Sequence, residues 1–189
     1  MSRKQFLLLL SLTYSQSIFA QSPIDTATIK KELAAIYDRD QKTRARGDSS
    51  QFADNIDSCN QVQVERLIAK YGWLGKSFVG VNGNRTVFLV IQHADLVKQE
   101  KYLPLMQKAV DDGESFASDL ALLQDRILMR QGKRQIYGSQ VVFGKKTGAQ
   151  VFYPIEDEKN VNERRKKVGL QPMEEYAKYF GIDYKLPVN

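Results

Sequence analysis

The chain has 189 residues, of which 42% are hydrophobic and 26% are charged, and its formal net charge is +6. These proportions are those of an ordinary globular protein, and they exclude a disordered, collagen-like or low-complexity chain. Because the chain has one cysteine and one histidine, an internal disulfide and the usual Cys- or His-rich zinc sites are excluded as well.

The first twenty residues predict a secretory signal peptide. Arg3 and Lys4 precede an apolar run that starts at Phe6, and Ala20 suits the position before a cleavage site. A buried N-terminal helix is the alternative. The run is too short and too interrupted by polar residues to span a bilayer. We therefore expect a signal peptide at 1–20 and a single globular domain at 21–189 that is periplasmic or secreted, with no stable membrane insertion after cleavage.

The charge balance argues against a nucleic-acid partner. Without residues 1–20 the chain keeps 26 basic and 22 acidic residues, a net charge of +4. Nucleic-acid-binding proteins carry a concentrated basic face, whereas the basic residues here are scattered apart from a run at 164–167, which we interpret as a solvated helix face. Cys59, a single thiol in an exported chain, is expected to be a small buried side chain.

Hydrophobic spacing in the first half of the chain predicts mostly helices. One helix is expected from Asp25, a suitable N-cap, to about Arg46, and a second from about Asn60 to Lys70. The glycine-containing stretch 72–84 is predicted to be a loop. The apolar run 86–91 favours a strand by propensity, although a buried helix is compatible with the same run.

The second half adds a hairpin to further helices. Helical spacing resumes over 95–109, with Pro104 expected in the first turn, and a strong helix follows from about Phe116 to Gly132. Residues 135–143 and 150–155 predict a β-hairpin around a turn at 144–148, and short helices are expected at 160–168 and 172–180. The predicted fold class is therefore mainly α (α+β), a single-domain helical assembly with one β-hairpin near residues 134–155.

Two acidic residues interrupt apolar helix faces. Asp40 shares the inward stripe of the first helix and lies four residues before Arg44, so the two can pair. Either the stripe leaves the core at that end, or an ion pair points into a pocket. Asp125 interrupts an apolar face of the helix at 116–131, and a carboxylate buried there needs a partner. That partner could be Arg44, Arg165, His93 or a backbone N–H, and a bond that only fixes packing is favoured over a carboxyl group prepared for acid–base chemistry.

A second set of polar residues surrounds His93 and the predicted hairpin. His93 follows the most hydrophobic run and is the only side chain with an ordinary pKa near neutrality, although a single histidine is most often a hydrogen-bonded core residue. Gln135 and Tyr137 share a strand face, and a bulge at Gly138 would turn Gln140 toward them. Amide and phenol groups of this kind can hold a polar ligand without charge.

Several of these residues belong to short motifs that occur in a fixed order and resemble those of a bacterial domain-of-unknown-function family. The resemblance covers roughly residues 30–180 and implies a largely helical domain, sometimes exported, without a known activity. Ser139 stands where threonine is expected and Leu74 where proline is expected. The motifs are Asp40-Gln41 with Arg44, Tyr71-Gly72-Trp73 before Val79-Gly80, Gln92-His93-Ala94-Asp95, Asp125-Arg126, Gln135-x-Tyr137-Gly138-x-Gln140, and Arg165 before Gly169-Leu170.

These residues predict one common site, and two classes of function remain open for it. In an enzyme, His93 would be the general acid or base and Asp125 or Asp95 would orient it. The remaining residues would bind substrate: Asp40, Gln41, Arg44, Gln92, Arg126, Gln135, Tyr137, Gln140 and Arg165.

No cofactor or metal motif is present, so we expect neither a cofactor nor a metal. The activity that fits is a metal-free hydrolase or transferase using general acid–base chemistry. The alternative is a non-catalytic binding or structural module of the cell envelope for a small polar ligand or peptide.

Overall fold

The computed structural model describes residues 25–45, 51–144 and 148–187. The predicted signal peptide and the middle of the predicted turn at 144–148 lie outside this part of the chain. The described residues contain seven α-helices and one two-stranded antiparallel hairpin. The predicted mainly helical fold with one hairpin is therefore confirmed. None of the described helices is both long and apolar enough to cross a membrane.

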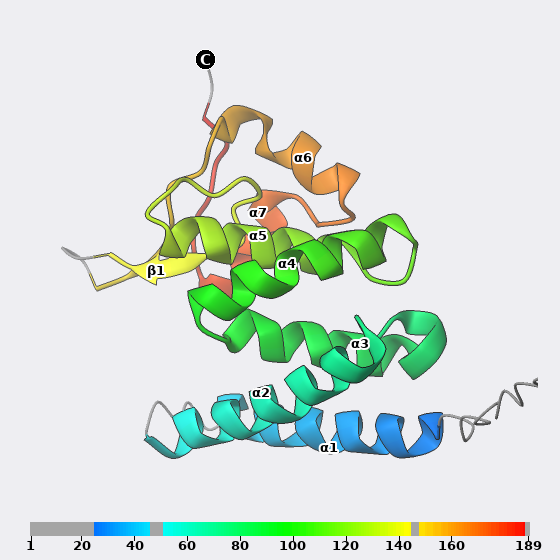
Figure 1. The fold of residues 1–189 in the computed structure, drawn as a ribbon. Coiled ribbons are helices and arrows are strands. Elements are labelled where there is room, and N and C mark those ends of the chain that lie inside the picture. Colours follow the sequence, from blue (N-terminus) through cyan, green and yellow to red (C-terminus); the bar gives the residue numbers. More distant parts are fainter. Residues whose placement is uncertain (1–24, 46–50, 145–147, 188–189) are drawn as a thin grey trace, which may run out of the picture.

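Five long helices form the larger part of the molecule, and consecutive helices run in opposite directions (Figure 1). They are α1 (Thr26–Ala45), α2 (Gln51–Tyr71), α3 (Lys76–His93), α4 (Leu96–Asp111) and α5 (Ala117–Arg130). α3 is central, because α1, α2, α4 and α5 all pack against it. The main hydrophobic core lies between these helices and includes Leu33, Ile36, Leu67, Ile91, Met106 and Leu123.

The C-terminal part lies on the far side of α5 from α3 (Figure 1). Strand β1 (Val141–Phe143) pairs with β2 (Gln150–Phe152), with Val142 opposite Val151. Short helices follow: η1 (Glu158–Asn160), α6 (Val161–Lys167), α7 (Met173–Ala177) and η2 (Lys178–Phe180). A second, smaller core joins these elements through Ile155, Val161 and Met173.

Two predicted helix starts are explained by side-chain caps. Oδ1 of Asp25 accepts hydrogen bonds from the backbone N–H groups of Ala27 and Thr28, each at 3.1 Å. Asp95 caps α4 by accepting from the backbone N–H of Lys98 at 2.9 Å. Because that cap starts α4 at Leu96, Pro104 lies inside the helix, and its predicted place in the first turn was wrong.

The first half of the chain is more helical than its sequence predicts. The predicted loop at 72–84 ends at Gly75, and the run at 86–91 is helical, so the favoured strand was wrong. α3 is surrounded by other helices, and a helix that is apolar on most sides loses the 3.6-residue pattern that would identify it. α2 begins at Gln51, well before Asn60. Its first turns are mostly polar, so they lack the apolar spacing from which the start was predicted.

Three other predictions were wrong in detail. The strands are only three residues long, and residues 136–140 form a loop in which Gly138 has a φ of +69° instead of a strand bulge. Cys59 is exposed, not buried. The basic run at 164–167 is not a fully solvated face, because Arg165 is buried and Arg164 donates a hydrogen bond to the carbonyl of Ile136 at 2.9 Å.

α3 bends at Gly80, and this bend requires glycine. Gly80 has φ +78° and ψ 172°, a backbone region that other residues avoid. We expect Gly80→Ala to lower the free energy of unfolding by about 1–3 kcal/mol, measured by urea denaturation. Val81→Ala, an exposed neighbour, is the control and should change it by less than about 0.5 kcal/mol. Equal stability of Gly80→Ala and the wild type would contradict the backbone argument.

Candidate functional site

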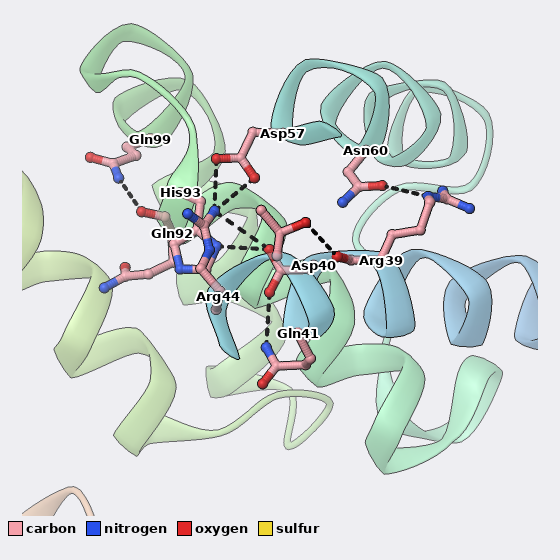
Figure 2. Close-up of polar contacts among 10 residues, drawn as sticks. Arg39, Asp40, Gln41, Arg44, Asp57, Asn60, Gln92, His93 and Gln99 are labelled. Atoms are coloured by element: carbon pink, nitrogen blue, oxygen red, sulfur yellow. Dashed lines mark hydrogen bonds and ion pairs between the residues drawn. The ribbon is translucent and has the colours of Figure 1, made fainter. Parts of the chain in front are cut away.

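A buried carboxylate, Asp40, lies at the centre of a polar cluster near the C-terminal ends of α1 and α3 (Figure 2). Asp40 is 2% exposed. Its Oδ1 lies 3.0 Å from Nδ1 of His93 and 3.6 Å from Nη2 of Arg44, and its Oδ2 accepts a hydrogen bond from Nε2 of Gln41 at 2.8 Å. The predicted pairing of Asp40 with Arg44 is confirmed, and the inward stripe of α1 stays in the core at this point.

The neighbours of Asp40 keep its carboxyl group ionised. Burial raises the pKa of Asp40, but the hydrogen bond and charge of His93, the charge of Arg44 and the hydrogen bond from Gln41 together hold that pKa below its usual value. An ionised carboxylate can only accept hydrogen bonds. Nδ1 of His93 must therefore carry the proton in this contact, and in the neutral ring Nε2 holds the free lone pair.

His93 is the last residue of α3, and its side chain is 21% exposed. Among the residues that the structure describes, His93 bonds to Asp40 alone, through Nδ1, so Nε2 makes no hydrogen bond to any of them. The imidazole is thus oriented by a buried anion on one side while its basic nitrogen is left for another partner. This arrangement is suited to proton transfer at Nε2.

Asp57 of α2 brings a second carboxylate to the cluster. Nη2 of Arg44 lies 2.7 Å from both carboxylate oxygens of Asp57 (Figure 2). With both acids ionised and Arg44 charged, the cluster has a net charge of −1 when His93 is neutral and of zero when His93 is protonated. Asp57 was missed in the sequence because it precedes the predicted start of the second helix.

Three of these residues could together hold a metal ion. Asp40, Asp57 and His93 each place one ligand atom within 4.8 Å of the other two, and two carboxylates with an imidazole are a donor set for divalent transition metals. In the structure, however, the guanidinium of Arg44 already binds Asp57 as the cation. Arg44 and a metal ion would therefore compete for the carboxylate of Asp57.

This competition predicts that Arg44→Ala will gain affinity for Zn²⁺. Removing the guanidinium frees the oxygens of Asp57 and leaves two carboxylates without a counter-charge, so we expect Zn²⁺ to bind the variant about tenfold or more tightly than the wild type in calorimetric titrations. Arg39→Ala is the control: Arg39 lies on the same helix as Arg44 but bonds to Asn60 of α2, so its removal should give no gain. Zn²⁺ binding to the wild type as tightly as to Arg44→Ala would show that Arg44 does not exclude a metal.

Asp125 lies in a different environment from His93. It is 0% exposed, and its oxygens accept hydrogen bonds from the backbone N–H groups of Ile136 at 2.7 Å, Tyr137 at 3.0 Å and Ser139 at 2.9 Å. Of the partners proposed from the sequence, backbone N–H groups are therefore the ones observed. Asp125 anchors the loop after α5.

Two glutamines complete this loop anchor. Gln135 donates from Nε2 to the carbonyl of Tyr153 at 2.6 Å and accepts at Oε1 from the backbone N–H of Gln140 at 2.8 Å. The side chain of Gln140 in turn donates to Oγ of Ser139 at 2.8 Å. The two side-chain amides thus bond to one another's segment and to Tyr153, and they connect the loop after α5 to the residues that follow β2.

Arg165 closes the same network from α6. It is 1% exposed and donates to the carbonyls of Tyr137 and Gln171, each at 2.6 Å. Its guanidinium also lies over the ring of Tyr176, 4.7 Å from the centroid. Arg165 therefore tethers backbone segments to one another. Tyr137, whose carbonyl it binds, is half-buried, and this burial raises the pKa of its phenol.

Comparison with known proteins identifies the family of this chain. A family model matches residues 15–189. The chain belongs to DUF6624, a family of unknown function. No curated protein and no solved structure matches it. The resemblance stated from the motifs is thereby confirmed, and DUF6624 membership assigns no activity.

Within this DUF6624 chain, the predicted site residues separate into two groups. Asp40, Gln41, Arg44 and His93 meet at one cluster, whereas Asp125, Gln135, Tyr137, Gln140 and Arg165 meet around the loop after α5. The expected orientation of His93 by Asp125 or Asp95 is corrected, because Asp125 binds backbone N–H groups and Asp95 caps α4.

Gln92 lies between the two groups. Its Nε2 and that of Gln140 each lie 3.4 Å from the carbonyl oxygen of Leu122, so the two regions are neighbours joined through α5. Arg126 belongs to neither hydrogen-bonded group and lines a separate cavity.

Proposed function

We propose that this protein is a hydrolase or transferase in which His93 acts as general acid and base, oriented by Asp40. The observation that carries the proposal is the 3.0 Å contact between Nδ1 of the only histidine and a carboxylate that is buried and ionised. A carboxylate in this position fixes the tautomer of the imidazole and stabilises the imidazolium that forms during proton transfer.

In the proposed reaction, Nε2 of His93 takes a proton from a water molecule or from the hydroxyl group of an acceptor as that oxygen attacks the substrate. The imidazolium then returns the proton to the leaving group, so His93 ends each turnover neutral. Arg44 binds Asp57 through Nη2, and its Nε and Nη1 form no hydrogen bond with any other described residue. Those donors are placed to stabilise negative charge that develops on the substrate.

Direct attack by water or an acceptor hydroxyl is favoured over a covalent intermediate. None of the described serine, threonine or cysteine side chains forms a hydrogen bond with His93, and an activated nucleophile requires that contact. Ser139 accepts instead from the side chain of Gln140, and Asp125 is occupied by backbone N–H groups. A triad of Ser139, His93 and Asp125 therefore has no support in these contacts.

A non-catalytic envelope module is the second candidate, and the loop network favours it. Asp125, Gln135 and Arg165 hold backbone groups and leave little capacity for a ligand, as expected of polar groups that define a unique core. For either candidate we propose a periplasmic or secreted location, supported by the basic start and apolar run of residues 1–20.

Chemical modification of His93 tests whether its Nε2 is accessible to a reagent in solution. Diethyl pyrocarbonate acylates neutral imidazole, and with a single histidine the ultraviolet signal of the untagged protein reports His93 alone. We expect the native protein to react at one equivalent, with a rate that rises as the imidazole loses its proton. His93→Asn is the control and should give no signal. Reaction only after unfolding in urea would mean that His93 is a closed core residue, and the proposal would fail.

A further inference from the structure

A cavity lies where α5 meets the hairpin and the C-terminal helices, apart from the His93 cluster. Its volume is about 280 Å³, and Asp40, Arg44 and His93 do not line it. The inference drawn from it does not rest on the proposed function. Its lining includes Arg126, Met129, Ser139, Phe143, Tyr176 and Phe180.

Arg126 contributes a positive charge that no described acid neutralises. Its Nε is buried and has no hydrogen-bond partner, and it forms no ion pair within the described part of the chain. The adjacent Asp125 cannot serve, because it is fully buried and bound to backbone N–H groups. A charge that is partly withdrawn from water and has no partner is unfavourable unless something supplies a counter-charge.

The electrostatic surroundings of Arg126 are positive. Burial lowers the pKa of Arg126, and the charges of Arg130 and Arg44 lower it further, while Tyr176 opposes them. Arg130 adds a second positive charge nearby, and its guanidinium donates to the carbonyl of Ala94. An arginine stays protonated under these conditions, so the cavity presents a net positive charge to any ligand.

The rest of the wall defines what else the ligand carries. Tyr176 donates its hydroxyl to the carbonyl of Ser139 at 3.0 Å, and Gln140 donates to Oγ of Ser139 at 2.8 Å. The hydroxyl proton of Ser139 therefore remains to be donated. The apolar side chains of Met129, Phe143 and Phe180 line the same cavity, so a ligand held by Arg126 would also meet apolar surface.

We propose that this cavity binds the carboxylate of a ligand that carries an adjacent apolar or aromatic group. Arg126 holds the carboxylate through charge-assisted hydrogen bonds, for which its planar fork is suited, and Ser139 donates a further one. The volume of about 280 Å³ lies just below the usual range for drug-sized ligands, which fits a ligand of about the size of one amino acid. A free carboxylic acid and the C-terminal residue of a peptide share this chemistry.

The test is a calorimetric titration of the mature protein with paired probes. Phenylacetate represents the free acid and N-acetyl-Ala-Phe the peptide C-terminus, and the matching amides of both probes lack the charge. We expect at least one acid to bind about 10–100-fold more tightly than its amide, as loss of charge-assisted hydrogen bonds implies. Binding of phenylacetate would identify free acids as sufficient, and binding of the peptide alone would assign a C-terminal residue.

Variants show whether Arg126 is responsible. Arg126→Gln should weaken acid binding by about tenfold or more, whereas Arg130→Gln, which removes the same charge one turn along α5 but does not line the cavity, should keep it within about threefold. Arg126→Gln should also unfold at the same temperature or higher, because it removes an unpaired charge.

The inference is overturned if neither acid binds the wild type more tightly than its amide, or if Arg126→Gln binds as well as the wild type. The comparison of acid with amide on the wild-type protein remains decisive even if a variant fails to fold. Loss of His93 function would leave this titration unchanged, so the two proposals fail separately.

Discussion

Asp125→Ala is expected to lower the free energy of unfolding by about 3–5 kcal/mol. The substitution leaves the backbone N–H groups of Ile136, Tyr137 and Ser139 without an acceptor, and each unsatisfied buried donor costs about 1–3 kcal/mol. The loop that these groups belong to connects α5 to the hairpin, so its release should also loosen the C-terminal elements. Urea denaturation followed by circular dichroism measures the loss.

Asp119 supplies a matched control on the same helix. It is also buried, but its Oδ2 has no hydrogen-bond partner among the described residues and lies 3.7 Å from Nε of Arg85. Burial raises the pKa of Asp119, so its ionised form is unfavourable in the folded state. Asp119→Asn should therefore be neutral or stabilising at neutral pH. A loss below about 1 kcal/mol for Asp125→Ala would contradict the anchoring role.

His93→Asn is expected to lower turnover by about 10²–10⁴-fold while leaving stability almost unchanged. The amide of asparagine can still donate to Asp40 from near the position of Nδ1, so the buried carboxylate keeps its partner. The asparagine amide, however, has no lone pair on a basic nitrogen and cannot accept a proton. The measurement is turnover of chromogenic esters, phosphoesters and peptides, with thermal unfolding in parallel.

The exposed Lys42 on α1 provides the comparison, because Lys42→Ala changes a charge close to the cluster without touching Asp40 or His93. Lys42→Ala should retain turnover within about twofold, equivalent to less than about 0.5 kcal/mol. If His93→Asn instead destabilises the protein strongly and turnover by the wild type is absent, the cluster is structural and the binding module is the better account.

The sequence predicts the helices with a clear apolar stripe, and it fails where that stripe is lost. α1 and α5 were predicted because buried apolar residues recur along each at helical spacing. α3 was missed in part because four helices pack against it. Its run 86–91 is therefore apolar on most sides and consists of residues that also favour strands. β-propensity was overridden there by tertiary packing.

The site was predictable only as far as its contacts are local. Asp40 and Arg44 are four apart on one helix, so their pairing follows from helical geometry. Asp40 and His93 lie 53 positions apart, and no periodicity in either helix indicates how α1 and α3 align. The partners of Asp125 are backbone N–H groups, which carry no residue-type signal at all.

The tautomer of His93 tests the central claim most directly. In the untagged, ¹⁵N-labelled protein, long-range ¹H–¹⁵N correlation spectra of the single imidazole distinguish protonated from unprotonated ring nitrogens. At a pH where the ring is neutral, the account predicts a proton on Nδ1 and a free lone pair on Nε2, because the ionised Asp40 accepts from Nδ1. A native spectrum with the proton on Nε2 and a bare Nδ1 would contradict the orientation of His93 by Asp40 and, with it, the proposed acid–base role.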